Sequence, residues 1–165
     1  MKTIDIIVPI YNAYEFTEEC IKSIIKNTDL NKHTLVLIND KSPDEKILPM
    51  LNKYKNENED KKIVVLDNEK NMGFVRTVNK GMKYSKNDVI LLNSDTEVTA
   101  NWIEKIQNCA YSSQYIATVT PLTNNGTICS VPNFGVDNEL PQNMNLEEYA
   151  LMIEKSSKSR YPELT

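Results

Sequence analysis

Short apolar runs alternate with segments of helical periodicity along this chain, and this alternation constrains its fold more than any other feature. The apolar runs occupy residues 4–10, 34–39, 63–66, 88–92 and 115–120. After each of the first four runs, apolar residues recur three or four positions apart, which is the spacing of one face of an α-helix. Strands that alternate with helices favour a parallel sheet, because the helix carries the chain back to the start of the next strand. We therefore predict an α/β fold in which a mostly parallel sheet is sandwiched by helices.

Five segments carry an apolar stripe at helical spacing, and each predicts a helix. The stripes are Phe16, Cys20, Ile21, Ile24 and Ile25; Ile47, Met50, Leu51 and Tyr54; Phe74, Val78 and Met82; Trp102, Ile106, Cys109 and Ala110; and Leu146, Tyr149, Ala150 and Ile153. The run DVILL at 88–92 is nearly all apolar, which predicts a central strand covered on both faces. Proline and glycine gather between residues 121 and 145, which is typical of a long loop. We predict an α/β core over residues 1–120, followed by a loop and a helix over residues 121–165.

The residue counts exclude several classes of protein. The chain has four glycines, and the nearest two, Gly73 and Gly81, are eight residues apart, so a G-x-G-x-x-G turn and a phosphate-binding P-loop are both impossible. A single histidine and three widely spaced cysteines argue against a multi-histidine metal site, a disulfide framework and a C-x-x-C zinc clip. With 19 basic against 23 acidic residues, the chain does not suit nucleic acid as a partner. No apolar run approaches the roughly 20 residues of a transmembrane segment. Because the cysteines are interpreted as reduced thiols, we expect a cytoplasmic protein, with peripheral attachment to the inner face of the membrane as the alternative.

Polar residues follow each of the first four apolar runs. Parallel α/β sheets bind ligands in the crevice beyond the carboxyl ends of their strands, so these residues are candidates for a binding site. Any one of them could instead cap the following helix, because Asp, Asn, Ser and Thr are also the preferred helix caps. They are Tyr11 and Asn12, Asp40 to Ser42, Asp67, Asn68 and Asn71, and Asn93 to Glu97.

Asp95 follows the most apolar run, in the sequence LLNSDT. A carboxylate beside a low-dielectric sheet needs a compensating partner, and a divalent cation shared with a phosphate-bearing ligand would supply one. Oxygen ligands favour Mg²⁺ or Mn²⁺ over zinc, because no thiolate or imidazole is close in sequence. The alternative is that Asp95 caps the helix that contains Trp102.

Four motifs follow one another within residues 4–106. They are IDIIVPIYNAYEFTEECIKSI, LVLINDKSPDE, NMGFVRTVNKGM and VILLNSDTEVTANWIEKI. In this order they resemble the N-terminal, nucleotide-sugar-binding half of glycosyltransferase family 2, and they imply the Rossmann-like nucleotide-binding half of the GT-A fold. The later segment PLTNNGTICSVP is more loosely similar to a subgroup that acts on bacterial surface polysaccharides.

The resemblance implies a role for each matching residue. Pro9 and Tyr11 would line the pocket of the base and ribose, and Asp40 would hydrogen-bond the base, uracil or thymine. Asp95 matches the last acid of the D-x-D-like motif, which binds the Mg²⁺ or Mn²⁺ that bridges the two phosphates. The other nucleotide-sugar-binding residues would be Asn71, Gly73, Arg76, Asn79, Asn93 and Ser94.

The implied reaction is transfer of a sugar with inversion, from a UDP or dTDP donor to an acceptor hydroxyl in cell-surface polysaccharide synthesis. The sugar would be a hexose or deoxyhexose, and the acceptor a saccharide or lipid-linked saccharide. Asn93 replaces the first acid of the D-x-D position, and Val78 stands where the family often has an Arg. The catalytic base of the family lies in its second half, so we expect it beyond Thr165 and expect negligible turnover by this chain alone.

Two other functions compete with a glycosyltransferase. A non-catalytic α/β nucleotide-binding or regulatory module would use Asp95 as a cap or phosphoacceptor; a response-regulator-like domain would have an acidic pair after its first strand and a Lys after its last one. This chain has Tyr11, Asn12 and Pro121 at those places. A nucleotidyltransferase would have a turn with Gly and Arg after the first strand, and VPIYNA contains neither.

Overall fold

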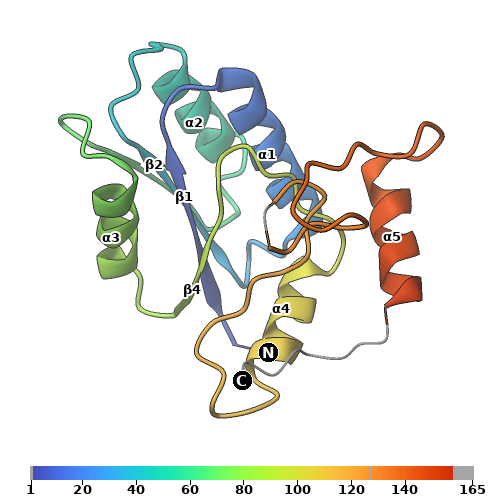
Figure 1. Ribbon diagram of the computed structural model, residues 1–165. Coiled ribbons are helices and arrows are strands. Elements are labelled where there is room, and N and C mark those ends of the chain that lie inside the picture. Colours follow the sequence, from blue (N-terminus) through green and yellow to red (C-terminus); the bar gives the residue numbers. More distant parts are fainter. Residues whose placement is uncertain (1, 127, 158–165) are drawn as a thin grey trace. The chain divides into compact units, whose positions relative to one another are not determined.

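A four-stranded parallel sheet forms the centre of the first of two compact units, Met1–Val98. The computed structural model describes residues 2–126 and 128–157. The sheet confirms the α/β fold that the alternation of apolar runs and helical segments predicts. Its strands lie in the spatial order β3-β2-β1-β4 (Figure 1) and are β1 (Ile4–Ile10), β2 (Thr34–Asn39), β3 (Ile63–Asp67) and β4 (Asp88–Leu91).

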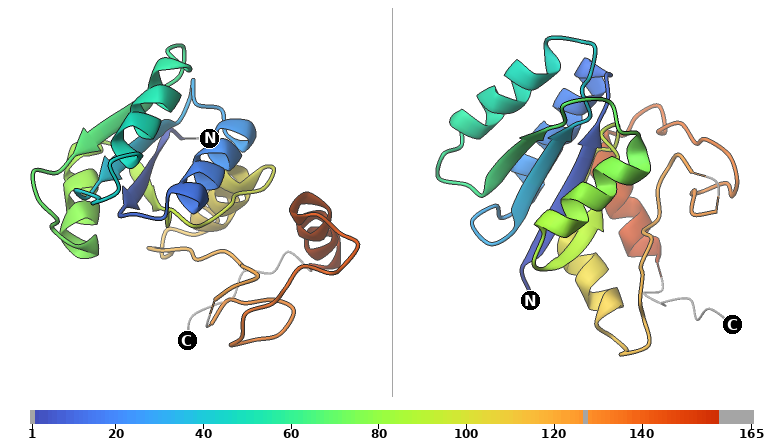
Figure 2. Two further views of the ribbon diagram at one scale, coloured as in Figure 1. Left: turned by 90° about the horizontal axis from the view of Figure 1, so that it is seen from above. Right: turned by 90° about the vertical axis from the view of Figure 1, so that its left-hand side faces the viewer.

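Helices cover both faces of this sheet. The helices α1 (Tyr14–Asn27) and α2 (Ile47–Asn56) lie on one face, and α3 (Phe74–Tyr84) lies on the other (Figures 1 and 2). The chain steps from β1 to β2 to β3 in one direction and then returns to place β4 on the other side of β1. Because parallel crossovers are right-handed, this reversal puts α3 opposite α1 and α2. In such sheets, ligands bind beyond the strand ends where the order reverses, here between β1 and β4.

The core lies on the two central strands, β1 and β2. Residues 6–8 of β1 and residues 35–38 of β2 are completely buried. The helix α3 approaches these strands closely at Gly81, where a Cβ atom would lie 2.6 Å from Ile7 Cγ2 and 2.8 Å from Ile38 Cδ1. The absence of a side chain at position 81 therefore lets α3 pack directly on the sheet.

Two predictions about strands are wrong. Within the described residues β4 is an edge strand that pairs only with β1, and its end residues Asp88 and Leu91 are exposed. An apolar run indicates that side chains tend to be buried, but it does not indicate whether the strand has a partner strand on one side or on both sides. Residues 115–120 form no strand. The β-branched residues of that segment therefore join no ladder, and β-propensity alone did not suffice to form a strand there.

The predicted helical stripes point partly in the wrong direction. Phe16 in α1, and Phe74 and Met82 in α3, are exposed, whereas Thr17 and Thr77 are completely buried on the same helices. Small residues allow a helix to come closer to the sheet than an aromatic side chain would. The smaller neighbours therefore take the inner positions, which apolar periodicity assigned to the larger residues.

In the second unit, Thr99–Thr165, the described residues form two helices. They are α4 (Trp102–Ala110) and α5 (Leu146–Ser156), at the places that the fourth and fifth stripes predict. Between them, residues 111–126 and 128–145 make two isolated β-bridges and otherwise consist of turns and irregular structure. In the described parts of the chain, no helix has the length and apolar character needed to cross a bilayer.

Candidate functional site at the carboxyl edge of the sheet

The loops that follow the strands are bonded to one another at the carboxyl edge of the sheet. Asp40 N, after β2, donates to Ile10 O at the end of β1, over 2.8 Å. Asn12 N, in the turn after β1, donates to Ser42 Oγ in the turn after β2, over 3.0 Å. The structure thus brings the polar residues after the first two strands together, as expected for parallel strands.

Asp40 holds the loop that joins β3 to α3. The residue is only 4% exposed, and its carboxylate accepts hydrogen bonds from Asn68 Nδ2, Met72 N and Gly73 N, each 2.8 Å long. Burial alone would raise the pKa of this carboxyl, but these bonds, with one from Thr77, outweigh burial and lower the pKa of Asp40. Asp40 is therefore a buried carboxylate whose charge is stabilised by the loop that it fixes.

A second layer of polar contacts surrounds Asp40. Lys80 Nζ donates to Asn68 Oδ1 over 2.6 Å and to Asp67 O over 3.1 Å. Asn39 Nδ2 donates to Asp67 Oδ1 over 2.8 Å. These contacts join β2, β3 and α3, so the loop has little freedom to rearrange when a ligand binds.

The loop after β4 carries Asp95 and is attached to α1. Val98 N donates to Ser23 Oγ over 3.0 Å, and Val98 O accepts from Asn27 Nδ2 over 2.9 Å. At the other end of the loop, Leu92 N donates to Ile7 O of β1 over 3.0 Å. Both ends of the loop are therefore fixed to the rigid part of the first unit.

Asp95 lies in a turn at the tip of this loop. Thr96 N donates to Asn93 O over 3.2 Å to close the turn, and Cys20 Sγ donates to the same oxygen over 3.6 Å. Burial raises the pKa of the Cys20 thiol to about 12, so it stays protonated as a donor. Asn93 and Asp95 are exposed, and Ser94 is half-buried. The Asp95 carboxylate accepts no hydrogen bond from the described residues, which leaves it available to a ligand.

The residues around Asp95 fit a metal ion that is shared with a phosphate ligand. They offer one carboxylate, an amide oxygen and a hydroxyl, and Mg²⁺ is commonly held by one or two carboxylates with substrate phosphates and water. The described residues contain no group of three or more His, Cys, Asp or Glu side chains that could hold a metal without a ligand. The alternative role of Asp95 as a helix cap is wrong, because Asn101 occupies the N-cap position of α4.

The turn after β1 exposes Tyr11 beside the same edge. Tyr11 is 49% exposed, and Pro9 is half-buried in β1. The next residues, Asn12 and Ala13, have φ angles of 62° and 56°, in the left-handed region that residues other than glycine rarely adopt. Backbone conformations of this kind persist only where surrounding contacts enforce them, and they are common at functional sites.

The predicted residues between positions 71 and 79 divide between the loop before α3 and the outer side of α3. Asn71 and Gly73 lie in the loop that Asp40 fixes, where Gly73 N also donates to Asn71 Oδ1 over 2.9 Å. Arg76 and Asn79 are exposed on the outer side of α3, away from its buried residues. There they line a groove of about 360 Å³ together with Met72, Lys80 and Lys83.

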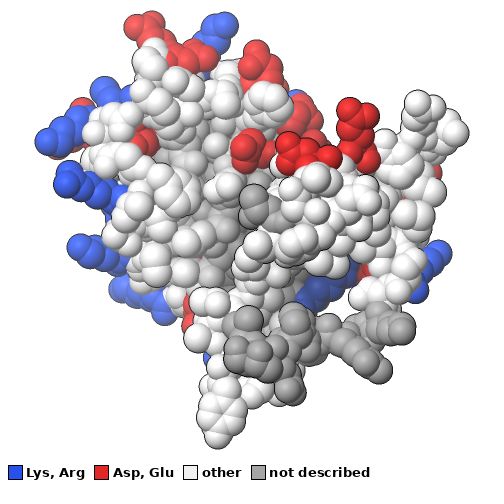
Figure 3. All heavy atoms as spheres, viewed as in Figure 1, with Lys and Arg blue, Asp and Glu red and all other residues white. Residues whose placement is uncertain are grey.

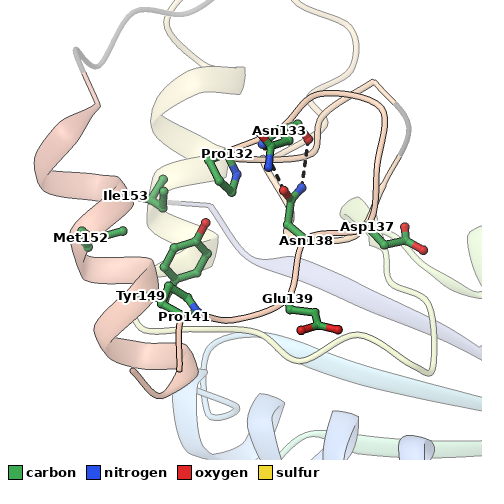
Figure 4. Close-up of a pocket in the computed structure, with 9 residues that line it drawn as sticks. All are labelled: Pro132, Asn133, Asp137, Asn138, Glu139, Pro141, Tyr149, Met152 and Ile153. Carbon is green, nitrogen blue, oxygen red and sulfur yellow. Dashed lines mark hydrogen bonds between the residues drawn. The ribbon is translucent and has the colours of Figure 1, made fainter. Parts of the chain in front are cut away.

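The second unit has a pocket of its own, of about 340 Å³, between α5 and the loop before it (Figure 4). Asn138 is 8% exposed and orders this loop. Its Nδ2 donates to Asn133 O over 2.9 Å and to Val136 O over 3.1 Å, and its Oδ1 accepts from Asn133 N over 3.1 Å. The long segment that Pro and Gly predict to be a loop is therefore organised around one buried amide.

The residues that position the two loops of the first unit are not among those predicted from the sequence. Ser23 and Asn27 hold the Asp95 loop, and Thr77 and Lys80 support the Asp40 loop. Their signal is a polar residue on the inner side of an amphipathic helix. Ser23 and Asn27 stand three and seven positions after Cys20, so they share its face of α1.

Comparison with known proteins identifies similar sequences. The family model of glycosyl transferase family 2 matches residues 5–129. An uncharacterized glycosyltransferase of Haemophilus influenzae is 33% identical over 106 residues, which are 62% of this chain and 31% of that protein. The chain therefore spans about a third of the length of this curated relative.

Solved structures share the fold. A mannosyltransferase from Pyrobaculum calidifontis, in complex with GDP-Man and Mn²⁺, is 18% identical with a TM-score of 0.57, over 72% of this chain and 33% of that one. TarS from S. aureus, in complex with UDP-GlcNAc, is 24% identical with a TM-score of 0.58, over 66% of this chain and 31% of that one.

Proposed function

Because the chain belongs to glycosyl transferase family 2, we propose that its first unit binds the nucleotide-diphosphate-sugar donor of a sugar transfer. The observation that carries this proposal is the carboxyl edge of the sheet. There an exposed carboxylate, Asp95, lies on a loop bonded to α1, at the same edge of the sheet as the loops that Asp40 joins. A fixed edge with an exposed carboxylate such as Asp95 suits a ligand that brings its own phosphates and a cation.

The cofactor in this proposal is Mg²⁺ or Mn²⁺ at Asp95. The residues of the loop would hold it through the Asp95 carboxylate, with the Asn93 amide and the Ser94 hydroxyl beside it. When bound, such a cation neutralises the charge that develops on a departing nucleoside diphosphate. The need for a cation is plain from charge, since the chain has a net charge of −4 and a diphosphate is an anion.

The nucleoside in this proposal lies against the turns after β1 and β2. Tyr11, half exposed, and Pro9 would contact the base and ribose, and the base would be uracil or thymine. Asp40 already accepts several hydrogen bonds from its own loop, so its main contribution would be to hold Asn71 and Gly73 near the diphosphate. Arg76 and Asn79 have the least support as donor contacts, because both lie on the outer side of α3.

The acceptor in this proposal is a hydroxyl group of a saccharide or a lipid-linked saccharide. Attack on the anomeric carbon opposite the diphosphate would invert the configuration of a transferred hexose or deoxyhexose. The similarity of PLTNNGTICSVP to enzymes of bacterial surface polysaccharides supports a role in cell-surface polysaccharide synthesis.

Isothermal titration with UDP, dTDP and GDP, each with and without Mn²⁺, tests the proposal. We expect Mn²⁺-dependent binding of UDP or dTDP that weakens at least about tenfold in Asp95→Ala. Asp60→Ala removes an exposed carboxylate of the loop before β3 and serves as the control, with unchanged affinity. Binding of GDP but not of UDP or dTDP would contradict uracil or thymine as the base. No binding of any of the three nucleotides would contradict the proposed donor site and favour a module without donor chemistry.

A further inference from the structure

The segment that contains α3 carries a charge opposite to that of the whole chain. Residues 70–87 contain five basic residues and no acidic one. The remainder of the chain has 14 basic and 23 acidic residues. Positive charge is therefore concentrated in one short segment of an acidic protein.

This positive charge lies on the outer surface of the first unit. Thr77, Val78 and Gly81 are the buried residues of α3, so the opposite side of the helix faces solvent. Arg76 and Lys83 lie on that side and line the groove described above. Figure 3 shows several blue side chains along the left-hand side of the view, where Figure 1 places α3 and the loop before it.

The basic side chains at the ends of this segment are available to a partner. Lys80 is engaged by Asn68 and Asp67, as described above. In contrast, the ammonium groups of Lys70, Lys83 and Lys86 make no hydrogen bond or ion pair with any described residue, and all three side chains are exposed. Their charges are thus not neutralised by the protein itself.

Apolar side chains are exposed beside these cations. Val75, Met82 and Tyr84 of α3 are 68%, 46% and 49% exposed. A helix that presents Lys and Arg together with apolar side chains to solvent is typical of segments that lie at the surface of an anionic bilayer. Nucleic acid could pair its phosphates with the cations, but it would gain little from Val75 and Met82. Their apolar side chains cannot form hydrogen bonds or ion pairs with phosphates or with the polar edges of bases.

We propose that the outer surface of α3 and its C-terminal end, defined by Val75, Met82, Lys83 and Lys86, binds the phosphate headgroups of an anionic phospholipid bilayer. The ammonium groups pair with lipid phosphates, and the apolar side chains enter the boundary between headgroups and acyl chains. This surface lies outside the proposed donor site, so the inference goes beyond the proposed function and can fail independently of it.

The C-terminal end of α3 is anchored far from the donor edge. Asp5, at the amino end of β1, accepts hydrogen bonds from Ser85 Oγ, Lys86 N and Asn87 Nδ2. Lys83 and Lys86 therefore lie towards the amino edge of the sheet, whereas Asp40 and Asp95 follow its carboxyl ends. A bilayer seated on Lys83, Lys86 and Met82 would leave the donor edge open to solution.

Co-sedimentation with lipid vesicles tests this proposal on the intact chain. We expect the protein to bind vesicles that contain phosphatidylglycerol, not vesicles of phosphatidylcholine alone, and to be released at about 0.5 M salt, where charges are strongly screened. The double variant Lys83→Glu/Lys86→Glu is expected to lower partitioning at low salt at least about tenfold. Val75→Ser/Met82→Ser, which removes the apolar contacts and leaves the charge unchanged, is also expected to lower partitioning at low salt.

The control variant Lys46→Glu/Lys55→Glu makes the same change in net charge on the opposite face of the sheet, at α2. An equal loss of partitioning in this control would overturn the proposal, because it would show an effect of net charge alone. Titration with inorganic phosphate and with a single-stranded oligonucleotide distinguishes other anions. Binding of either one without vesicle binding would also overturn it. Unchanged Mn²⁺-dependent nucleotide binding in Lys83→Glu/Lys86→Glu would show that the donor site is intact.

Discussion

Asp40 connects the fold of the first unit to its proposed chemistry. Its buried carboxylate binds two backbone N–H groups of the loop that leads into α3. A backbone amide that loses a buried partner costs free energy, because water cannot fully replace the lost bond. Asp40 is therefore expected to act on both the stability of the unit and the geometry of the donor edge.

Substitution of Asp40 tests this double role. Asp40→Ala is expected to lower the free energy of unfolding by roughly 2–4 kcal/mol, because three hydrogen bonds to a charged group are lost. Asp40→Asn is expected to cost less, about 1–2 kcal/mol, since its amide oxygen can still accept from the loop. Urea unfolding of both variants measures these losses, and equal stability of Asp40→Ala and the parent chain would contradict the role.

Ser23 tests the attachment of the Asp95 loop to α1. Ser23→Ala removes the acceptor of Val98 N, so we expect a loss of about 1 kcal/mol in unfolding free energy and weaker Mn²⁺-dependent nucleotide binding. Ser156→Ala, at an exposed position of α5, is the matched control and should change neither quantity. Nucleotide affinity that is unchanged in Ser23→Ala would show that the loop is held in another way.

At the level of elements, the contact between α3 and the sheet depends on position 81. Alanine normally stabilises a helix relative to glycine by roughly 1 kcal/mol. In Gly81→Ala we expect the opposite sign, a loss of about 1–3 kcal/mol, because the new Cβ would overlap Ile7 and Ile38. Thermal unfolding beside Asn79→Ala, at an exposed position of the same helix, measures the difference; a stabilised Gly81→Ala would contradict the packing.

In the first unit, the sequence predicts the strands and helices better than it predicts the order of the strands in the sheet or the side of each helix that packs on it. Strands and helices followed from local periodicity, and the ends of β1 and β2 agree with the predicted runs. The position of β4 at an edge could not be predicted, because pairing depends on distant segments. The inner residues of α1 and α3 were also misjudged, since small residues such as Thr17 and Gly81 set the distance between helix and sheet.

The candidate site was predictable in part. The rule that ligands bind at the carboxyl ends of parallel strands brought Asp40, Asn68 and Asp95 into one set. The supporting contacts of Ser23, Asn27 and Lys80 were not predictable from that rule, because they depend on which side of a helix faces which loop. Such contacts become visible only when the packing of helix on sheet is known.

For the whole molecule, two buried carboxylates at opposite edges of the sheet predict acid sensitivity. Burial opposes the charge of Asp5, but hydrogen bonds from Ser85, Asn87, Thr34 and Lys86 outweigh it and lower its pKa; the pKa of Asp40 is lowered in the same way. A carboxyl whose pKa is lower in the folded than in the unfolded state stabilises the fold above its ordinary pKa of 3.8. That stability is lost as the pH falls through the lower, folded value.

Urea unfolding between about pH 7 and pH 3 measures this loss. We expect the free energy of unfolding to decrease as the pH falls below about 5, and to decrease less in Asp5→Asn, which has no charge to lose. Asp60→Asn, at an exposed position, should keep the slope of the parent chain. An identical slope in Asp5→Asn and the parent chain would contradict the assignment.

The claim that a diphosphate donor binds through a cation at Asp95 has one most direct test. A crystal structure of the chain with UDP and Mn²⁺ should show the metal in contact with an Asp95 carboxylate oxygen, at about 2.0–2.2 Å, and with oxygens of both phosphates. A nucleotide bound elsewhere, or a metal that touches the phosphates while the Asp95 carboxylate points to solvent, would contradict the account.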